Sequence, residues 1–335
     1  MYPENLHFSR KLNITQALKI GLEDLKSKQG ILSPSNEHIL TISAHVARNM
    51  HDLSQFTESA TLLETLIADL NASSFAATDP ATFTRKILGF IHGLASNYCS
   101  LDLHQKAIDT CTDGINKYGL HLSPDNLDVL GLKEVIAIAK LHLSNVTEVL
   151  PLAETILEVR SKAYGLAHPS TLIAMRTCFR AYSESGMYDR AWDVQERCVG
   201  FMRETFGMEH MQTKQAMFAL AEFPLKHDLP RRKWKKALVY REEVLRLMRA
   251  EYGEGELRVW EYMAELAMEL FRVGDVRRAV EVQEEVVRGL EQLVGVEGRD
   301  GTEKLLERKR GDLVMMRKAM KARRMVGWLV PGKVV

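Results

Sequence analysis

Cysteine is scarce in this sequence, and its copies show no pairing pattern. Of 335 residues only four are cysteine, and no two of them form a CxxC motif: Cys99, Cys111, Cys178 and Cys198. Each lies in a stretch with helical periodicity, so neither a disulfide framework nor a thiolate metal site is indicated. This usage favours a reducing compartment, and we expect a cytoplasmic or nuclear protein.

Long apolar runs and an excess of one charge are also missing. No stretch approaches the roughly 18 apolar residues of a membrane helix, and the opening MYPENLHFSR lacks the basic start and apolar core of a signal peptide. We therefore expect no membrane span and no signal peptide. Because 45 Lys and Arg stand against 44 Asp and Glu, the overall charge gives no attraction to nucleic acid or membranes.

Signatures of catalysis and cofactor binding are absent or incomplete. There is no His-Glu-x-x-His and no Gly-x-Ser-x-Gly, and the eleven histidines show no metal-ligand spacing beside a carboxylate. Residues 327–333 spell most of a phosphate-binding loop, but Val334 replaces the Ser or Thr that would hold magnesium. We expect a protein that is not an enzyme, with no cofactor and no metal. The alternative is an all-α enzyme with an enclosed pocket of convergent ionisable groups.

What the sequence does contain is a repeat of 42 to 46 residues, with one complete copy at 149–207. A mostly small residue recurs once per copy near the start of a helix, where it lets two helices cross closely. Leu103 breaks this rule, and Ala107 is the alternative register in that copy. The positions are Ala17, Ser59, Leu103, Val149, Ala191, Ala237 and Ala279.

Each copy is predicted to form two amphipathic helices. Apolar residues in 172–182 recur at steps of three and four, and Gly186 is placed to end that helix with a positive φ. We expect an all-α solenoid with five full antiparallel helix pairs and flanking helices. An irregular lead-in covers residues 1–11, the repeat array 12–295, and a capping helix with a frayed tail 296–335.

The motifs Gly186-x-Tyr188-x-x-Ala191, Leu150-Pro151-Leu152 and Ala163-Tyr164-Gly165 resemble the long tetratricopeptide (TPR) repeat of the kinesin light chain type. The resemblance implies a right-handed TPR-like superhelical solenoid whose concave groove binds peptides. It also extends to the sensor arrays of NTPase switch proteins, and so implies a protein-interaction scaffold or the recognition array of a larger regulatory system. One feature departs from it. The Asn-Asn pair that lines the groove in that family is replaced, for instance by Arg176-Thr177 and Phe218-Ala219.

In this class of repeat, one stripe of each first helix makes the concave wall. Projected onto the predicted helices, the stripe carries a broken line of arginines interrupted by glutamates, which suits a protein or peptide segment with acidic residues. The alternative is an ordinary solvated surface. The candidate groove residues are Arg48, Arg85, His92, Glu134, His142, Arg176, Arg180, Glu184, Phe218, Glu222, Glu261, Met268 and Arg272.

Two basic clusters, 231–236 and 308–324, support a second alternative. The first combines five cations with Trp234, and the second reads as a basic amphipathic helix. Either could bind RNA or an anionic membrane. We favour a solvated helix start and a solvated cap instead, and therefore regard nucleic acid as the less favoured partner.

Overall fold

The structure, a computed structural model, describes residues 4–28, 31–33, 36–227, 229–253, 255–297 and 300–329. Nearly all of them lie in helices, which confirms the all-α fold. The helices are α1 (Glu4–Lys28), α2 (Glu37–Asp52), α3 (Phe56–Ala72), α4 (Phe75–Thr78), α5 (Pro80–Ser100), α6 (His104–Gly114) with a π-helical turn (Ile115–Gly119), α7 (Leu127–His142), α8 (Val146–Tyr164), α9 (Pro169–Glu184), α10 (Tyr188–Phe206), α11 (Met211–Lys226), α12 (Arg231–Tyr252), α13 (Leu257–Val273), α14 (Val276–Glu297) and α15 (Asp300–Leu329).

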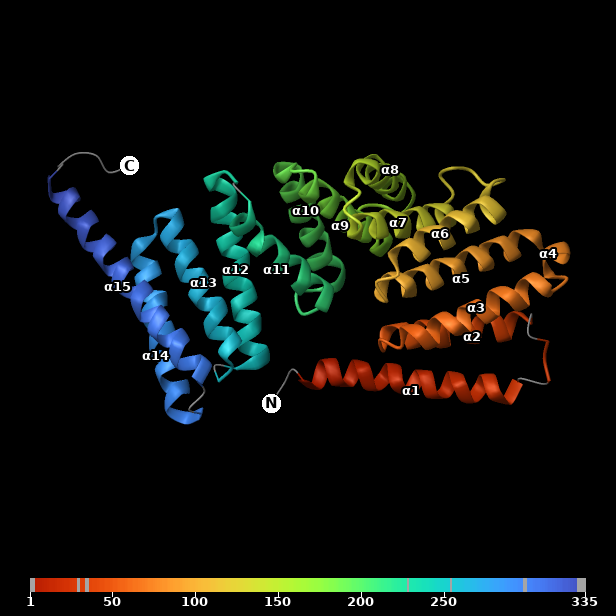
Figure 1. Ribbon diagram of the computed structural model, residues 1–335, viewed down its shortest axis with the longest axis horizontal. Coiled ribbons are helices and arrows are strands. Elements are labelled where there is room, and N and C mark those ends of the chain that lie inside the picture. The colour runs from red at the N-terminus through yellow and green to blue at the C-terminus, as the bar shows by residue number, and fades with distance from the viewer. Residues whose placement is uncertain are drawn as a thin grey trace. The chain divides into compact units, whose positions relative to one another are not determined.

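The chain divides into an N-terminal unit, Asn5–Phe201, and a C-terminal unit that begins at Met202. The N-terminal unit contains the pairs α2–α3, α5–α6, α7–α8 and α9–α10, and the C-terminal unit contains α11–α12 and α13–α14 (Figure 1). The described residues thus form six pairs, one more than expected. The first of the seven crossing positions lies in α1, which begins the array with no preceding helix among the described residues. The other six positions imply six pairs, so the expected count of five was one short.

The turns inside five of the pairs share one geometry. Each has a single residue with positive φ, and the amide after it donates to the carbonyl five residues earlier at 2.8 to 3.0 Å. This hydrogen bond closes the end of a helix in the manner of a Schellman motif. The predicted role of Gly186 is confirmed by its φ of 72°. The five positions are Ser54, Asp102, Ser144, Gly186 and Gly274.

The crossing positions are confirmed in five copies and corrected in two. Leu103 is 46% exposed whereas Ala107 is fully buried, so the alternative register is the one adopted. Ala17 is exposed, and α1 approaches α2 closely at Gly21 instead, where a Cβ would come within 2.8 Å of Val46 Cγ2. The confirmed positions are each 0 or 1% exposed, and they are Ser59, Val149, Ala191, Ala237 and Ala279.

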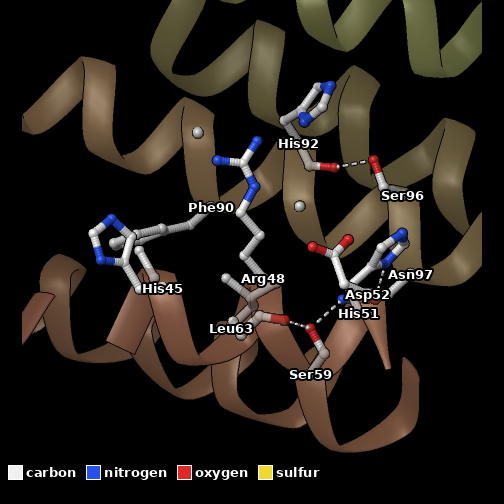
Figure 2. Close-up of a pocket in the computed structure, with 14 residues that line it drawn as sticks. His45, Arg48, His51, Asp52, Ser59, Leu63, Phe90, His92, Ser96 and Asn97 are labelled. Carbon is white, nitrogen blue, oxygen red and sulfur yellow. Dashed lines mark hydrogen bonds between the residues drawn. The ribbon is translucent and has the colours of Figure 1, made fainter. Parts of the chain in front are cut away.

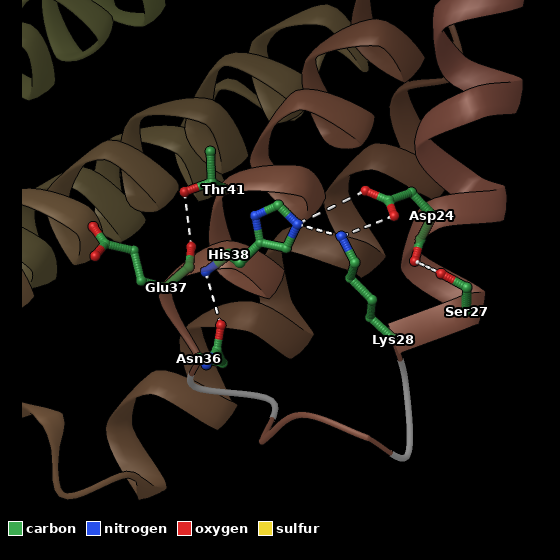
Figure 3. Close-up of polar contacts among 7 residues, drawn as sticks. All are labelled: Asp24, Ser27, Lys28, Asn36, Glu37, His38 and Thr41. Atoms are coloured by element: carbon green, nitrogen blue, oxygen red, sulfur yellow. Dashed lines mark hydrogen bonds and ion pairs between the residues drawn. The ribbon is translucent and has the colours of Figure 1, made fainter.

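Helix α1 begins at Glu4, so the stretch expected to be an irregular lead-in is helical from that residue onward. Polar contacts join the end of α1 to the start of α2 (Figure 3). Asp24 lies 3.0 Å from Lys28 Nζ and 3.9 Å from His38 Nε2, and Lys28 Nζ also contacts the His38 ring. Asn36 caps α2 by accepting a hydrogen bond from the His38 amide at 3.0 Å.

Helix α15 packs on α14 at the C-terminal end of the array. The Gln283 side chain donates to the Lys309 carbonyl at 3.0 Å, and Arg317 pairs with Glu284 at 2.8 Å. The predicted apolar side of α15 is buried at Leu313 and Met316. Residues 330–335, part of the tail expected to fray, lie outside the described residues. Among the described helices, none combines the length and apolar character needed to cross a bilayer.

Candidate functional site

A polar cleft of about 440 Å³ lies between α2, α3 and α5 in the N-terminal unit (Figure 2). It brings together two of the predicted groove residues, Arg48 from α2 and His92 from α5. Successive turns of α2 supply one wall because its residues 44, 48 and 51 share a face. We call it the α2–α5 cleft, and its lining is Ala44, His45, Ala47, Arg48, His51, Asp52, Ser59, Leu63, Gly89, Phe90, His92, Gly93, Ser96 and Asn97.

A chain of hydrogen bonds forms the floor of this cleft. Ser59 Oγ donates to the Ala47 carbonyl at 2.7 Å and accepts from Asn97 Nδ2 at 2.8 Å. The Asn97 amide oxygen therefore faces His51, whose Nδ1 lies 2.7 Å away. Because that oxygen can only accept, Nδ1 of His51 donates to it, and Nε2 is the other polar atom of the ring. Sequence reasoning missed Asn97, although an asparagine within the apolar pattern of residues 81–97 was a signal.

The ionisable groups of the cleft differ in their contacts and charge. Arg48 is exposed and forms no ion pair or hydrogen bond with any described residue. The pKa of His92 is lowered, first by burial and then by Arg160, Arg48 and His51, so its ring is neutral near pH 7. Asp52 is the one carboxylate among the lining residues. The cleft therefore offers a guanidinium without an ion pair near the neutral imidazole of His92.

A second group of predicted residues meets at the ends of α7 and α9. Arg180 Nη1 lies 3.4 Å from His142 Nε2, and Arg180 Nη2 lies 3.9 Å from Glu184. The His142 ring stacks on His104 with centroids 4.5 Å apart. Burial first, and then Arg180, lowers the pKa of His142, which suits a neutral ring accepting from the guanidinium.

The structure corrects the placement of Glu134, which is 4% exposed and does not present its charge on an open surface. Its carboxylate receives a 2.6 Å hydrogen bond from Arg160 of α8, which also donates to the Ser170 carbonyl at 3.0 Å. Burial raises the pKa of Glu134, and Arg160 opposes that effect. The pair stabilises the packing of α7, α8 and α9, a role that sequence reasoning missed because Arg160 lies on a second helix.

Two further arginines of the predicted stripe have no ion pair among the described residues. Arg85 is exposed and lines a separate cleft of about 550 Å³ between the starts of α5 and α7. Arg176 is half-buried on α9. Together with Arg48, these give the first helices of the N-terminal unit three arginines with no carboxylate at ion-pair distance in the described part of the chain, although the charge of Arg85 acts on the carboxylates of Asp79 and Asp128.

The predicted residues of the C-terminal unit have a different character. Phe218 of α11 is 37% exposed and stacks on Tyr262 of α13 at 5.4 Å, and Glu222 pairs with Lys226 at 3.3 Å. Behind them, Arg241 is fully buried and lies over the Tyr262 ring. Glu261 and Arg272 are exposed, and Met268 is half-buried.

The basic clusters are partly used within the fold. Lys233 is 3% exposed and Lys309 is 8% exposed, so neither belongs to an open cationic surface. On α15, Arg310 pairs with Glu291 at 2.6 Å, as Arg317 does with Glu284. These contacts reduce the charge that the clusters could offer to nucleic acid. Over the described ranges, no group of three or more His, Cys, Asp and Glu is placed to hold a metal ion.

No protein-family model matches the chain, and no curated protein sequence matches it either. Solved structures do resemble it. The TPR-like repeats of a kinesin light chain from Podosopora anserina share 20% identity at a TM-score of 0.52, covering 62% of this chain and 97% of that one. A signal-transduction ATPase with a tetratricopeptide repeat sensor, from Pyrococcus horikoshii, shares 13% identity at 0.56, covering 90% of this chain and 47% of that one.

A third similar structure is Nro1, a hypoxic regulator of sterol synthesis described as a nuclear import adaptor. It shares 14% identity at a TM-score of 0.51, and the match covers 88% of this chain and 99% of that one. At these identities the likeness concerns the fold. This chain therefore has the fold of TPR-like helical repeats, as its motifs predicted.

Proposed function

We propose that this protein is a non-catalytic interaction scaffold that binds an acidic segment of another protein on the first helices of its N-terminal unit. The observation that carries the proposal is the set of three unpaired arginines, Arg48, Arg85 and Arg176, on helices α2, α5 and α9. Arginine binds carboxylates through two parallel hydrogen bonds. A further support is the fold shared with a repeat sensor and with an import adaptor.

A displayed library of random peptides tests this function with the full chain as bait. We expect the selected peptides to be enriched in Asp and Glu. In the double variant Arg176→Glu/Arg180→Glu, the affinity of a selected peptide should fall by at least about tenfold, which corresponds to about 1.4 kcal/mol. Fluorescence anisotropy measures the affinity, and circular dichroism checks that the helices are intact.

The matched control is Lys162→Glu/Arg190→Glu, which reverses two exposed charges on second helices of the same unit. That control should bind the peptide within about twofold of the native chain, since exposed charges away from the site contribute little. An unselective library, or the same loss of affinity in both double variants, would contradict the proposal.

A further inference from the structure

Gly89 is a glycine that the fold itself does not require. It lies in the interior of α5, where glycine costs about 0.5 to 1 kcal/mol relative to alanine. Its φ is outside the left-handed region, and a Cβ built on it would meet no heavy atom within 4 Å. Neither backbone conformation nor crowding therefore explains the residue. A glycine also permits close approach of a ligand to the backbone, and Gly89 lines the α2–α5 cleft.

The side chains around Gly89 fit one kind of ligand. Figure 2 shows Arg48 extending from α2 toward α5, with His45 on one side and with Asp52 and His92 on the other. Its guanidinium has no ion-pair partner among the described residues. A guanidinium without an ion pair is suited to binding a carboxylate. His51 lines the same cleft, and with Nδ1 donating to Asn97 at 2.7 Å the acceptor of the uncharged ring is Nε2.

We propose that the α2–α5 cleft takes an aspartate or glutamate side chain of the bound segment. Arg48 binds the carboxylate, His51 Nε2 accepts a backbone N–H of the segment, and Gly89 is the flat surface against which the backbone of the segment lies. This assignment rests on the proposed function and adds to it the position of one acidic residue. The floor formed by Asn97 and Ser59 fixes the His51 ring, so the site exists before the segment binds.

The test uses the full chain and two oligoglycine peptides with blocked termini. They differ only at the central residue, which is glutamate in one peptide and glutamine in the other. We expect the glutamate peptide to bind at least about tenfold more tightly, a difference of about 1.4 kcal/mol. Arg48→Gln should abolish this difference. Gly89→Leu should weaken the glutamate peptide at least about tenfold while the melting temperature stays the same or rises, because the added side chain fills open space.

Arg190→Gln is the matched control, since it removes an exposed arginine of the same unit that lies outside this cleft and on a second helix. It should leave the affinity of the glutamate peptide within about twofold. The subsite is contradicted if the native chain does not prefer glutamate at millimolar peptide, or if Arg48→Gln and Gly89→Leu bind as the native chain does. If library-selected acidic peptides still lose affinity in Arg176→Glu/Arg180→Glu, the proposed function stands and this subsite alone is wrong.

Discussion

Two sites, one in each unit, use a helical glycine and an arginine in opposite ways. In the C-terminal unit, a Cβ at Gly289 of α14 would come within 2.4 Å of the Trp260 ring, and Arg241 is fully buried beside Glu269 at 2.8 Å. In the N-terminal unit, Gly89 faces open space and Arg48 is exposed and unpaired among the described residues.

The difference separates residues that hold the fold from residues that the fold leaves exposed. Gly289 is needed because the indole of Trp260 occupies the space of a side chain, and Arg241 is needed because it compensates the buried Glu269. Gly89 and Arg48 satisfy no such requirement.

Removing the buried arginine should have the largest effect. Arg241→Met leaves the Glu269 carboxylate buried without its 2.8 Å partner, and we expect the free energy of unfolding to fall by roughly 3 to 5 kcal/mol. Arg48→Met should change it by less than about 0.5 kcal/mol, as surface substitutions do. Urea denaturation followed by circular dichroism measures both. Similar losses in the two variants would remove the contrast.

The same buried pair should make stability depend on pH. Burial first raises the pKa of Glu269 to about 7, although Arg241 opposes the effect. The folded state therefore holds this proton more tightly than the unfolded chain. Stability from this group is complete below about pH 4.5 and is lost as the pH rises toward 7, by up to about 3 kcal/mol. Glu269→Gln should flatten that slope in melting curves recorded across this range, and an unchanged slope would assign it to other groups.

Filling the crowded glycine should have an intermediate effect. Gly289→Ala places a methyl group against the Trp260 ring, whose atoms lie 2.4 to 2.5 Å from the new Cβ. We expect the free energy of unfolding to fall by about 1 to 3 kcal/mol, as overpacking does. Combining it with Trp260→Leu should recover part of that loss, because the two sites are in contact. If Gly289→Ala were instead more stable than the native chain, the contact between α13 and α14 would accommodate the methyl group without strain.

Filling the uncrowded glycine should have the smallest effect and the opposite sign. Gly89→Ala meets no atom within 4 Å, so the alanine should raise the free energy of unfolding by about 0.5 to 1 kcal/mol. Thermal melting compared with Gly289→Ala gives a direct readout. A loss of stability at this position would mean that the cleft is more crowded than its geometry indicates.

Much of the architecture could be predicted because it depends on neighbours in the sequence. Gly186 ends its helix with positive φ, and Ala191 is fully buried at the crossing that follows. Ser54, Asp102 and Ser144 adopt the same turn without glycine, and composition gave no sign of that. The register at Leu103 was left open between two choices, and burial of Ala107 decided it.

The candidate site was harder to predict. Helical periodicity placed Arg48 and His92 on one predicted stripe, and both line the α2–α5 cleft. The cleft also depends on Asn97 and Ser59, which meet across 38 residues. Glu134 was expected on an open wall because nothing in its own helix reveals Arg160, 26 residues away. The arginines of the predicted stripe look alike in the sequence, whereas the contacts made by other helices differ for each.

Periodicity, small crossing residues and turn chemistry by themselves determined that this chain forms stacked helix pairs, because these signals act over a few residues. The tertiary structure alone decided which charges are buried in pairs and which remain exposed. That distinction depends on side chains brought together from different helices, where burial makes an unpaired charge costly and so selects its neighbour.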